Sequence, residues 1–101
     1  MPIKRRKLIA ILISKGFQQV DDKLNRDHDW LYFTDPYTGK VYTQIRTKIS
    51  RGRKYRVLSD DYLSKISREL KFKSKKLFDD YLECTYTHVD HYDDLRQRNI
   101  I

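Results

Sequence analysis

The stretch that determines the fold runs from His28 to Ile49 and reads HDWLYFTDPYTGKVYTQIRTKI. Two runs of alternating apolar and polar residues flank the segment Asp35–Gly39, and this pattern predicts a β-hairpin. Pro36 fixes one backbone φ at about −65°, and Gly39 can adopt a positive φ. Both properties suit a tight turn, so the two runs are expected to pair as antiparallel strands.

Side chains alternate between the two faces of a strand, so each run divides into two sets. One set is mainly aliphatic: Leu31, Phe33, Val41, Thr43, Ile45, Thr47 and Ile49. The other set is polar or aromatic: His28, Trp30, Tyr32, Tyr42, Gln44, Arg46 and Lys48. We expect the aliphatic set to join the core, which leaves one histidine, three aromatic rings and two cations on an open face.

The composition indicates one domain with a basic surface. The chain has 101 residues, of which 36% are charged and 39% hydrophobic, and its formal net charge is +8. This length suits a single domain spanning 1–101 with a modest core. A positive charge of this size favours a polyanionic partner, either nucleic acid or an acidic protein.

Cysteine and histidine usage argues against a cofactor. Cys84 is the one cysteine, so an intrachain disulfide and a multi-cysteine zinc site are excluded, and we expect it to be buried in a cytoplasmic protein. His88 and His91 would share a helix face beside several aspartates, a set that could bind zinc. Their spacing fixes no third ligand, so neither a metal nor another cofactor is expected. The longest apolar run, Leu8–Ile13, is far shorter than the ~20 residues of a membrane span.

The remaining chain predicts one strand and four helices. Helices are expected over 3–15, ending at Gly16, over 60–71 behind Ser59 as N-cap, behind Ser74, and over 88–98 behind Thr87. A short strand is expected at 17–20, a turn or loop at 22–27 and a loop at 51–56. The order α-β-β-β-α-α-α predicts an α+β fold: a three-stranded antiparallel sheet, helices packed on one face, and extra C-terminal helices.

Two clusters of positive charge stand out. The segment 46–56 holds six cations and no acid: Arg46, Lys48, Arg51, Arg53, Lys54 and Arg56. The N-terminal cluster holds Lys4, Arg5, Arg6 and Lys7. Like charges repel, so such blocks persist most easily when an anion binds them. For the segment 46–56, solvation alone, contact with nucleic acid and contact with an acidic protein remain the alternatives. For the N-terminal cluster, the alternatives are a solvated first turn and contact with phosphate.

Three sets of residues carry a resemblance to a known family: Gly16-Phe17, His28 with Trp30 and Tyr32 after it, and Gly39-Lys40-Val41. Over about residues 3–70 the chain resembles the HicA family of toxin–antitoxin toxins, which have a double-stranded-RNA-binding-domain-like fold. The resemblance implies an RNA-binding endoribonuclease (an mRNA interferase) that an acidic antitoxin of the HicB kind neutralises. It also implies a core at 1–73, with 74–101 as a C-terminal helical extension.

The family typically shows Gly-Ser-His-His before its aromatic residue, whereas this chain has Arg26-Asp27-His28-Asp29-Trp30. Only His28 therefore carries over as the catalytic residue. Imidazole can transfer protons near neutral pH, and the RNA 2′-OH supplies the nucleophile without a metal.

The open face would supply the other groups that RNA cleavage needs. Arg46 and Lys48 could stabilise the phosphorane, and the rings of Trp30, Tyr32 and Tyr42 could stack on unpaired bases. The alternative is a non-catalytic module that binds nucleic acid or protein, in which His28 is only a polar residue at a strand start and the rings pack on the sheet.

Overall fold

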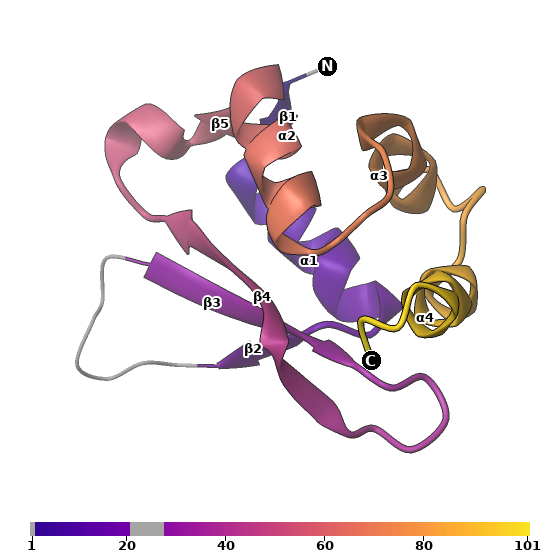
Figure 1. Cartoon of the computed structure of the whole chain (residues 1–101). Coiled ribbons are helices and arrows are strands. Elements are labelled where there is room, and N and C mark those ends of the chain that lie inside the picture. Colours follow the sequence, from indigo (N-terminus) through magenta and orange to yellow (C-terminus); the bar gives the residue numbers. More distant parts are fainter. Residues whose placement is uncertain (1, 21–27) are drawn as a thin grey trace.

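The computed structural model describes residues 2–20 and 28–101, and the predicted loop at 22–27 lies outside them. The elements in order are β1 (Ile3–Lys4), α1 (Arg5–Lys15), β2 (Gln18–Val20), β3 (His28–Thr34), β4 (Val41–Ser50), the 3₁₀ turn η1 (Arg53–Tyr55), β5 (Val57–Leu58), α2 (Asp60–Glu69), α3 (Lys75–Leu82) and α4 (His88–Gln97). The predicted α+β class is confirmed, because β2, β3 and β4 form a three-stranded antiparallel sheet in that order. The helices gather over one side of this sheet (Figure 1).

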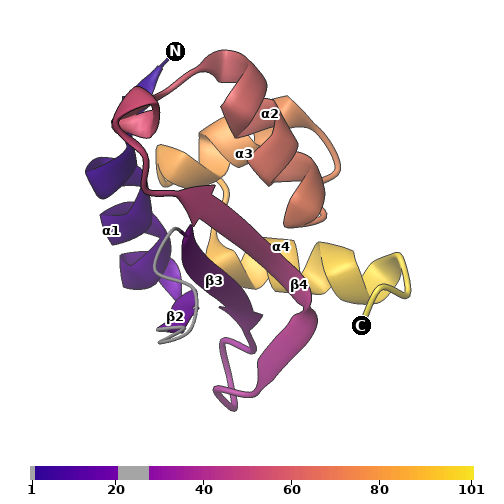
Figure 2. The same cartoon turned by 90° about the vertical axis from the view of Figure 1, so that its left-hand side faces the viewer.

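The hairpin forms where the alternation predicts it. Along β3, Leu31 and Phe33 are fully buried, while Trp30 and Tyr32 on the other face are partly exposed. The turn is tight because the Asp35 carboxylate accepts hydrogen bonds from the N–H groups of Tyr37 and Thr38. The first of these bonds holds the pKa of Asp35 below its usual value. Figure 2 looks onto β3 and β4 with helices α3 and α4 behind them, so that no helix covers the face toward the viewer.

A β-bulge corrects the prediction for Tyr42. Tyr32 pairs with Arg46, but the next residue, Phe33, pairs with Tyr42, so β4 contains three extra residues at this point. An odd number of extra residues reverses the alternation of faces. Tyr42 therefore shares the face of Phe33, with its ring centroid 5.9 Å from that ring, and packs against the core instead of joining the open face. The predicted alternation holds between 45 and 49.

The second sheet was not predicted. Two-residue strands β1 and β5 pair antiparallel, with Ile3 opposite Leu58 and Lys4 opposite Val57. This pairing delays the start of α1 to Arg5, two residues later than expected. At the other end, α1 stops at Gly16 as predicted, because this residue has a φ of +128° that other residues rarely adopt.

The C-terminal helices begin at their predicted caps. The side chains of Ser59, Ser74 and Thr87 each accept a hydrogen bond from the backbone N–H three residues later. Residues after 74 are part of the same hydrophobic core as the sheet, since Phe78 and Leu95 are fully buried in one cluster with Phe33. The predicted extension is thus packed into the body of the domain.

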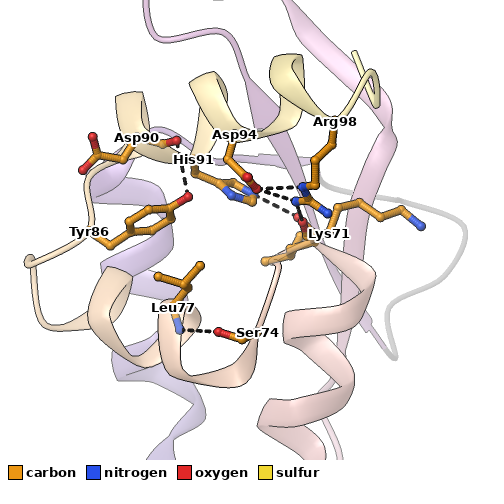
Figure 3. Close-up of polar contacts among 9 residues, drawn as sticks. Lys71, Ser74, Leu77, Tyr86, Asp90, His91, Asp94 and Arg98 are labelled. Carbon is orange, nitrogen blue, oxygen red and sulfur yellow. Dashed lines mark hydrogen bonds and ion pairs between the residues drawn. The ribbon is translucent and has the colours of Figure 1, made fainter.

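Two buried histidines attach α4 to the rest of the fold. His88 Nε2 donates to the Thr34 carbonyl at 2.7 Å, which leaves Nδ1 to accept a hydrogen bond from the Tyr81 hydroxyl at 3.0 Å. His91 Nε2 donates to the Leu70 carbonyl at 3.0 Å, and its ring stacks on Phe72 at 3.8 Å between centroids. Figure 3 shows His91 pointing from α4 into the space between that helix and the segment that follows α2.

The expectation that Cys84 is buried is wrong. This residue is exposed, with a positive φ of 70° just after α3, and its Sγ lies 3.1 Å from Lys15 Nζ. Cys84 lies in the exposed turn after α3, and this position in the chain determines its exposure in spite of its apolar side chain. Within the described ranges, no helix is both long enough and apolar enough to cross a membrane.

Candidate nucleic-acid interface

The open face of the sheet brings together most of the residues that the alternation assigned to it. His28, Trp30 and Tyr32 come from β3, and the register places Lys48 opposite Trp30 and Arg46 opposite Tyr32. Arg46 Cζ lies 5.3 Å from the Trp30 ring centroid, and Lys48 Nζ lies 5.9 Å from it. Both cations thus surround one indole ring, an arrangement that suits a ligand with aromatic bases and negative charge.

Strand β2 extends this face with two residues that were not predicted to lie on it. Gln18 pairs with Tyr32, and Val20 pairs with Trp30, so both share the open face and both are exposed. The alternation of β2 alone covers three residues, which is too short to identify the outward side. The register of the sheet supplies that information.

His28 begins β3 opposite Ser50, at the end of the open face nearest the cationic segment 51–56. Its Nδ1 atom is buried and has no hydrogen-bond partner among the described residues. The neighbouring Asp29 points to the opposite face, as expected from alternation, and is buried. Its carboxylate lies 2.6 Å from Arg51 Nη2 and 2.9 Å from Gln19 Nε2. The charge of Arg51 is therefore balanced by a carboxylate, whereas no ion pair between described residues involves Arg53, Lys54 or Arg56.

The β1–β5 ladder joins the two basic clusters. The Arg5 N–H donates to the Arg56 carbonyl at 2.9 Å, and Arg5 Nη1 donates to the carbonyls of Ser50 at 2.9 Å and Gly52 at 3.2 Å. Arg5 is half-buried, whereas the side chains around it reach solvent. Segments separated by some fifty residues in sequence thereby form one positively charged surface.

This surface contains a hollow of about 480 Å³ lined by Lys4, Arg5, Arg6, Arg56 and Val57. A second hollow, of about 280 Å³, shares Arg5 and Arg6 and reaches Asp29 and Arg51. The lining of the larger hollow supplies four cations and no carboxylate. Arg53 and Lys54 of η1 are also exposed, next along the chain from the Gly52 carbonyl that holds Arg5.

The two histidines considered from the sequence as zinc ligands are engaged inside the fold. Among the described residues, no group of three or more histidine, cysteine or acidic side chains is placed to hold an ion. His88 and His91, the pair considered from the sequence, point into the core and donate to backbone carbonyls. Their burial lowers the pKa of both rings, and that of His91 falls to about 4. Their role in this structure is packing.

Comparison with protein-family models, with curated proteins and with solved structures finds no match to this chain.

Proposed function

We propose that the chain binds RNA through a basic surface and the open sheet face beside it. We define the basic surface by its exposed cations: Lys4, Arg6, Lys7, Arg53, Lys54 and Arg56. The observation that carries the proposal is the β1–β5 ladder, which unites two cationic clusters from distant parts of the sequence. Bringing two cationic clusters together raises the repulsion between like charges. A bound anion offsets this repulsion.

The open face favours single-stranded RNA over a duplex. Trp30 and Tyr32 lie on a sheet face that no helix covers, where unpaired bases can stack on them. Stacking of this kind contributes ~1–3 kcal/mol per base, and it requires bases that are not already paired. Arg46 and Lys48 beside the Trp30 ring can neutralise the phosphates that accompany those bases. The resemblance to HicA toxins supports RNA as the nucleic acid.

A binding measurement across a salt series tests the proposal. We expect a fluorescent single-stranded RNA to bind with a log Kd that depends linearly on log salt, because phosphate contacts release counterions. The double variant Arg53→Ala/Lys54→Ala should flatten the slope by about 1.4, at ~0.7 for each lost contact. Lys65→Ala/Lys73→Ala is the matched control, since it removes the same charge from α2 and the loop after it. Absence of binding at low salt, or equal effects of both variants, would refute the proposal.

A second candidate is RNA cleavage by His28, and one observation favours it. His28 lies on the same strand face as Trp30 and Tyr32, at the end nearest the basic surface. An RNA bound there would present its 2′-OH and scissile phosphate to the imidazole of His28, which is partly exposed on this face. Removal of the 2′-OH proton would let the 2′-oxygen attack the phosphorus. The P–O5′ bond would break, the 5′-oxygen would take up a proton, and a 2′,3′-cyclic phosphate would remain, without a metal.

The variant His28→Ala separates cleavage from binding. Loss of one acid–base group costs ~10²–10⁴ in rate, whereas affinity should change less than about tenfold because the phosphate contacts lie elsewhere. The assay follows labelled RNA in EDTA, with circular dichroism as a check on folding. Intact RNA with the native protein would leave a binding module, and equal cleavage by the variant would show that His28 is not the catalytic residue. In either case an acidic antitoxin would be expected to compete with RNA for the basic surface.

A further inference from the structure

The hollow lined by Lys4, Arg5, Arg6 and Arg56 differs from the rest of the basic surface because it is concave and is lined by four cations. We propose that this hollow binds a terminal phosphate, that is, a phosphomonoester at one end of an RNA strand. The inference rests on the proposed RNA binding and names the part of the RNA that the hollow would recognise.

Within the described part of the chain, the cations in the hollow have no carboxylate partner, and Arg5 is preorganised. Arg5 is held in place by the carbonyls of Ser50 and Gly52, which accept from its guanidinium without neutralising its charge. Among the described residues, no carboxylate forms an ion pair with Lys4, Arg6 or Arg56, and all three side chains are exposed. Arg5 is therefore oriented before an anion arrives, which lowers the entropy cost of binding at this residue, whereas the three exposed cations around it become ordered on binding.

The balance of charge favours a monoester over a diester. An internal phosphodiester carries one negative charge, whereas a phosphomonoester carries about −1.5 to −2 near neutral pH and offers three strong acceptor oxygens. The four cations that line the hollow exceed the single negative charge of one diester, and arginine can contact phosphate in a bidentate manner. A volume of about 480 Å³ holds a phosphate together with its attached sugar.

The position of the hollow fits the end of a bound strand. Arg5 contacts the Ser50 carbonyl, and Ser50 is the residue opposite His28 at the start of β3. The hollow therefore adjoins the same edge at which the open face begins. An RNA anchored there by its terminal phosphate can continue over His28 toward Trp30.

The test compares three short RNAs of one sequence that carry a 5′-phosphate, a 3′-phosphate or hydroxyl groups at both ends. At fixed salt we expect one phosphorylated RNA to bind at least about tenfold more tightly than the hydroxyl-ended RNA, and the comparison identifies which end. Arg6→Ala/Arg56→Ala should abolish this advantage. The matched control Arg53→Ala/Lys54→Ala should weaken all three RNAs and preserve their ratio. Neither variant removes a buried side chain, and circular dichroism checks the folding of each.

The outcomes distinguish this inference from the proposed function. Equal affinity for all three RNAs, with the usual dependence on salt, would overturn the terminal-phosphate site while leaving RNA binding intact. If no RNA binds, calorimetric titration with adenosine 5′-monophosphate and 3′-monophosphate still examines the hollow: binding that Arg6→Ala abolishes would support a monoester site, and absence of heat would overturn it. Binding of an acidic peptide in place of either phosphate would also overturn it, in favour of a protein partner.

Discussion

Lowering the pH from 7 to 5 should cost this domain about 2 kcal/mol of unfolding free energy through His91 alone. The ring is fully buried, and burial lowers its pKa from 6.5 to about 4. Nε2–H donates to the Leu70 carbonyl, so an added proton must enter at Nδ1, which has no partner among the described residues. The folded protein therefore resists protonation that the unfolded chain accepts freely.

The sign follows from proton linkage. Between pH 6.5 and about 4 the unfolded chain binds more protons at this position than the folded one, so stability is intact above pH 6.5 and falls as the pH drops. Each pH unit in this window is worth about 1.4 kcal/mol, which gives about 2 kcal/mol at pH 5 and about 3 kcal/mol once the folded form also protonates. The pKa of His88 is lowered by burial as well, and adds a loss in the same direction.

Urea denaturation at pH 7 and pH 5 measures this effect. The variant His91→Phe keeps a ring on Phe72 but removes the titrating group, so the difference between the two pH values should shrink by about 2 kcal/mol. At pH 7 the variant should lose about 1 kcal/mol, because the Leu70 carbonyl loses its donor. Phe72→Leu is the control, since it should destabilise the same site and retain the pH dependence. A His91→Phe protein that keeps the full pH dependence would refute the reasoning.

Two further predictions concern single backbone positions. Gly16→Ala should lower the unfolding free energy by about 2–4 kcal/mol, because a Cβ at this positive φ would lie 2.9 Å from His88 Nε2. An unchanged melting temperature would contradict this close contact. Ser59→Ala should cost about 1 kcal/mol in a thermal melt, because the Ser59 hydroxyl accepts from the Tyr62 N–H at the start of α2; a loss below a few tenths would show that water replaces this cap.

The sequence by itself predicted the parts of the fold that rest on local physics. The alternation from His28 to Ile49 identified the hairpin and the buried positions Leu31, Phe33 and Ile45, because a strand with one buried face must alternate. The helix caps at Ser59 and Ser74 were equally visible, since a capping hydroxyl acts within one turn. The same local logic identified His28, Trp30 and the two cations of the open face.

What remained hidden depends on contacts between distant segments. The bulge that moves Tyr42 to the core is a property of the pairing between β3 and β4, and periodicity within β4 alone carries no sign of it. Arg51 was indistinguishable from its basic neighbours until the fold placed it against Asp29.

The basic surface depends both on features visible in the sequence and on contacts that only the tertiary structure decides. The sequence revealed the two cationic clusters, because lysine and arginine carry their charge in any fold. Their union was decided only by tertiary structure, since strands of two residues, Ile3–Lys4 and Val57–Leu58, are too short to leave a periodic signal. The hollow exists because that ladder forms, and it brings Arg5 to the carbonyls of Ser50 and Gly52.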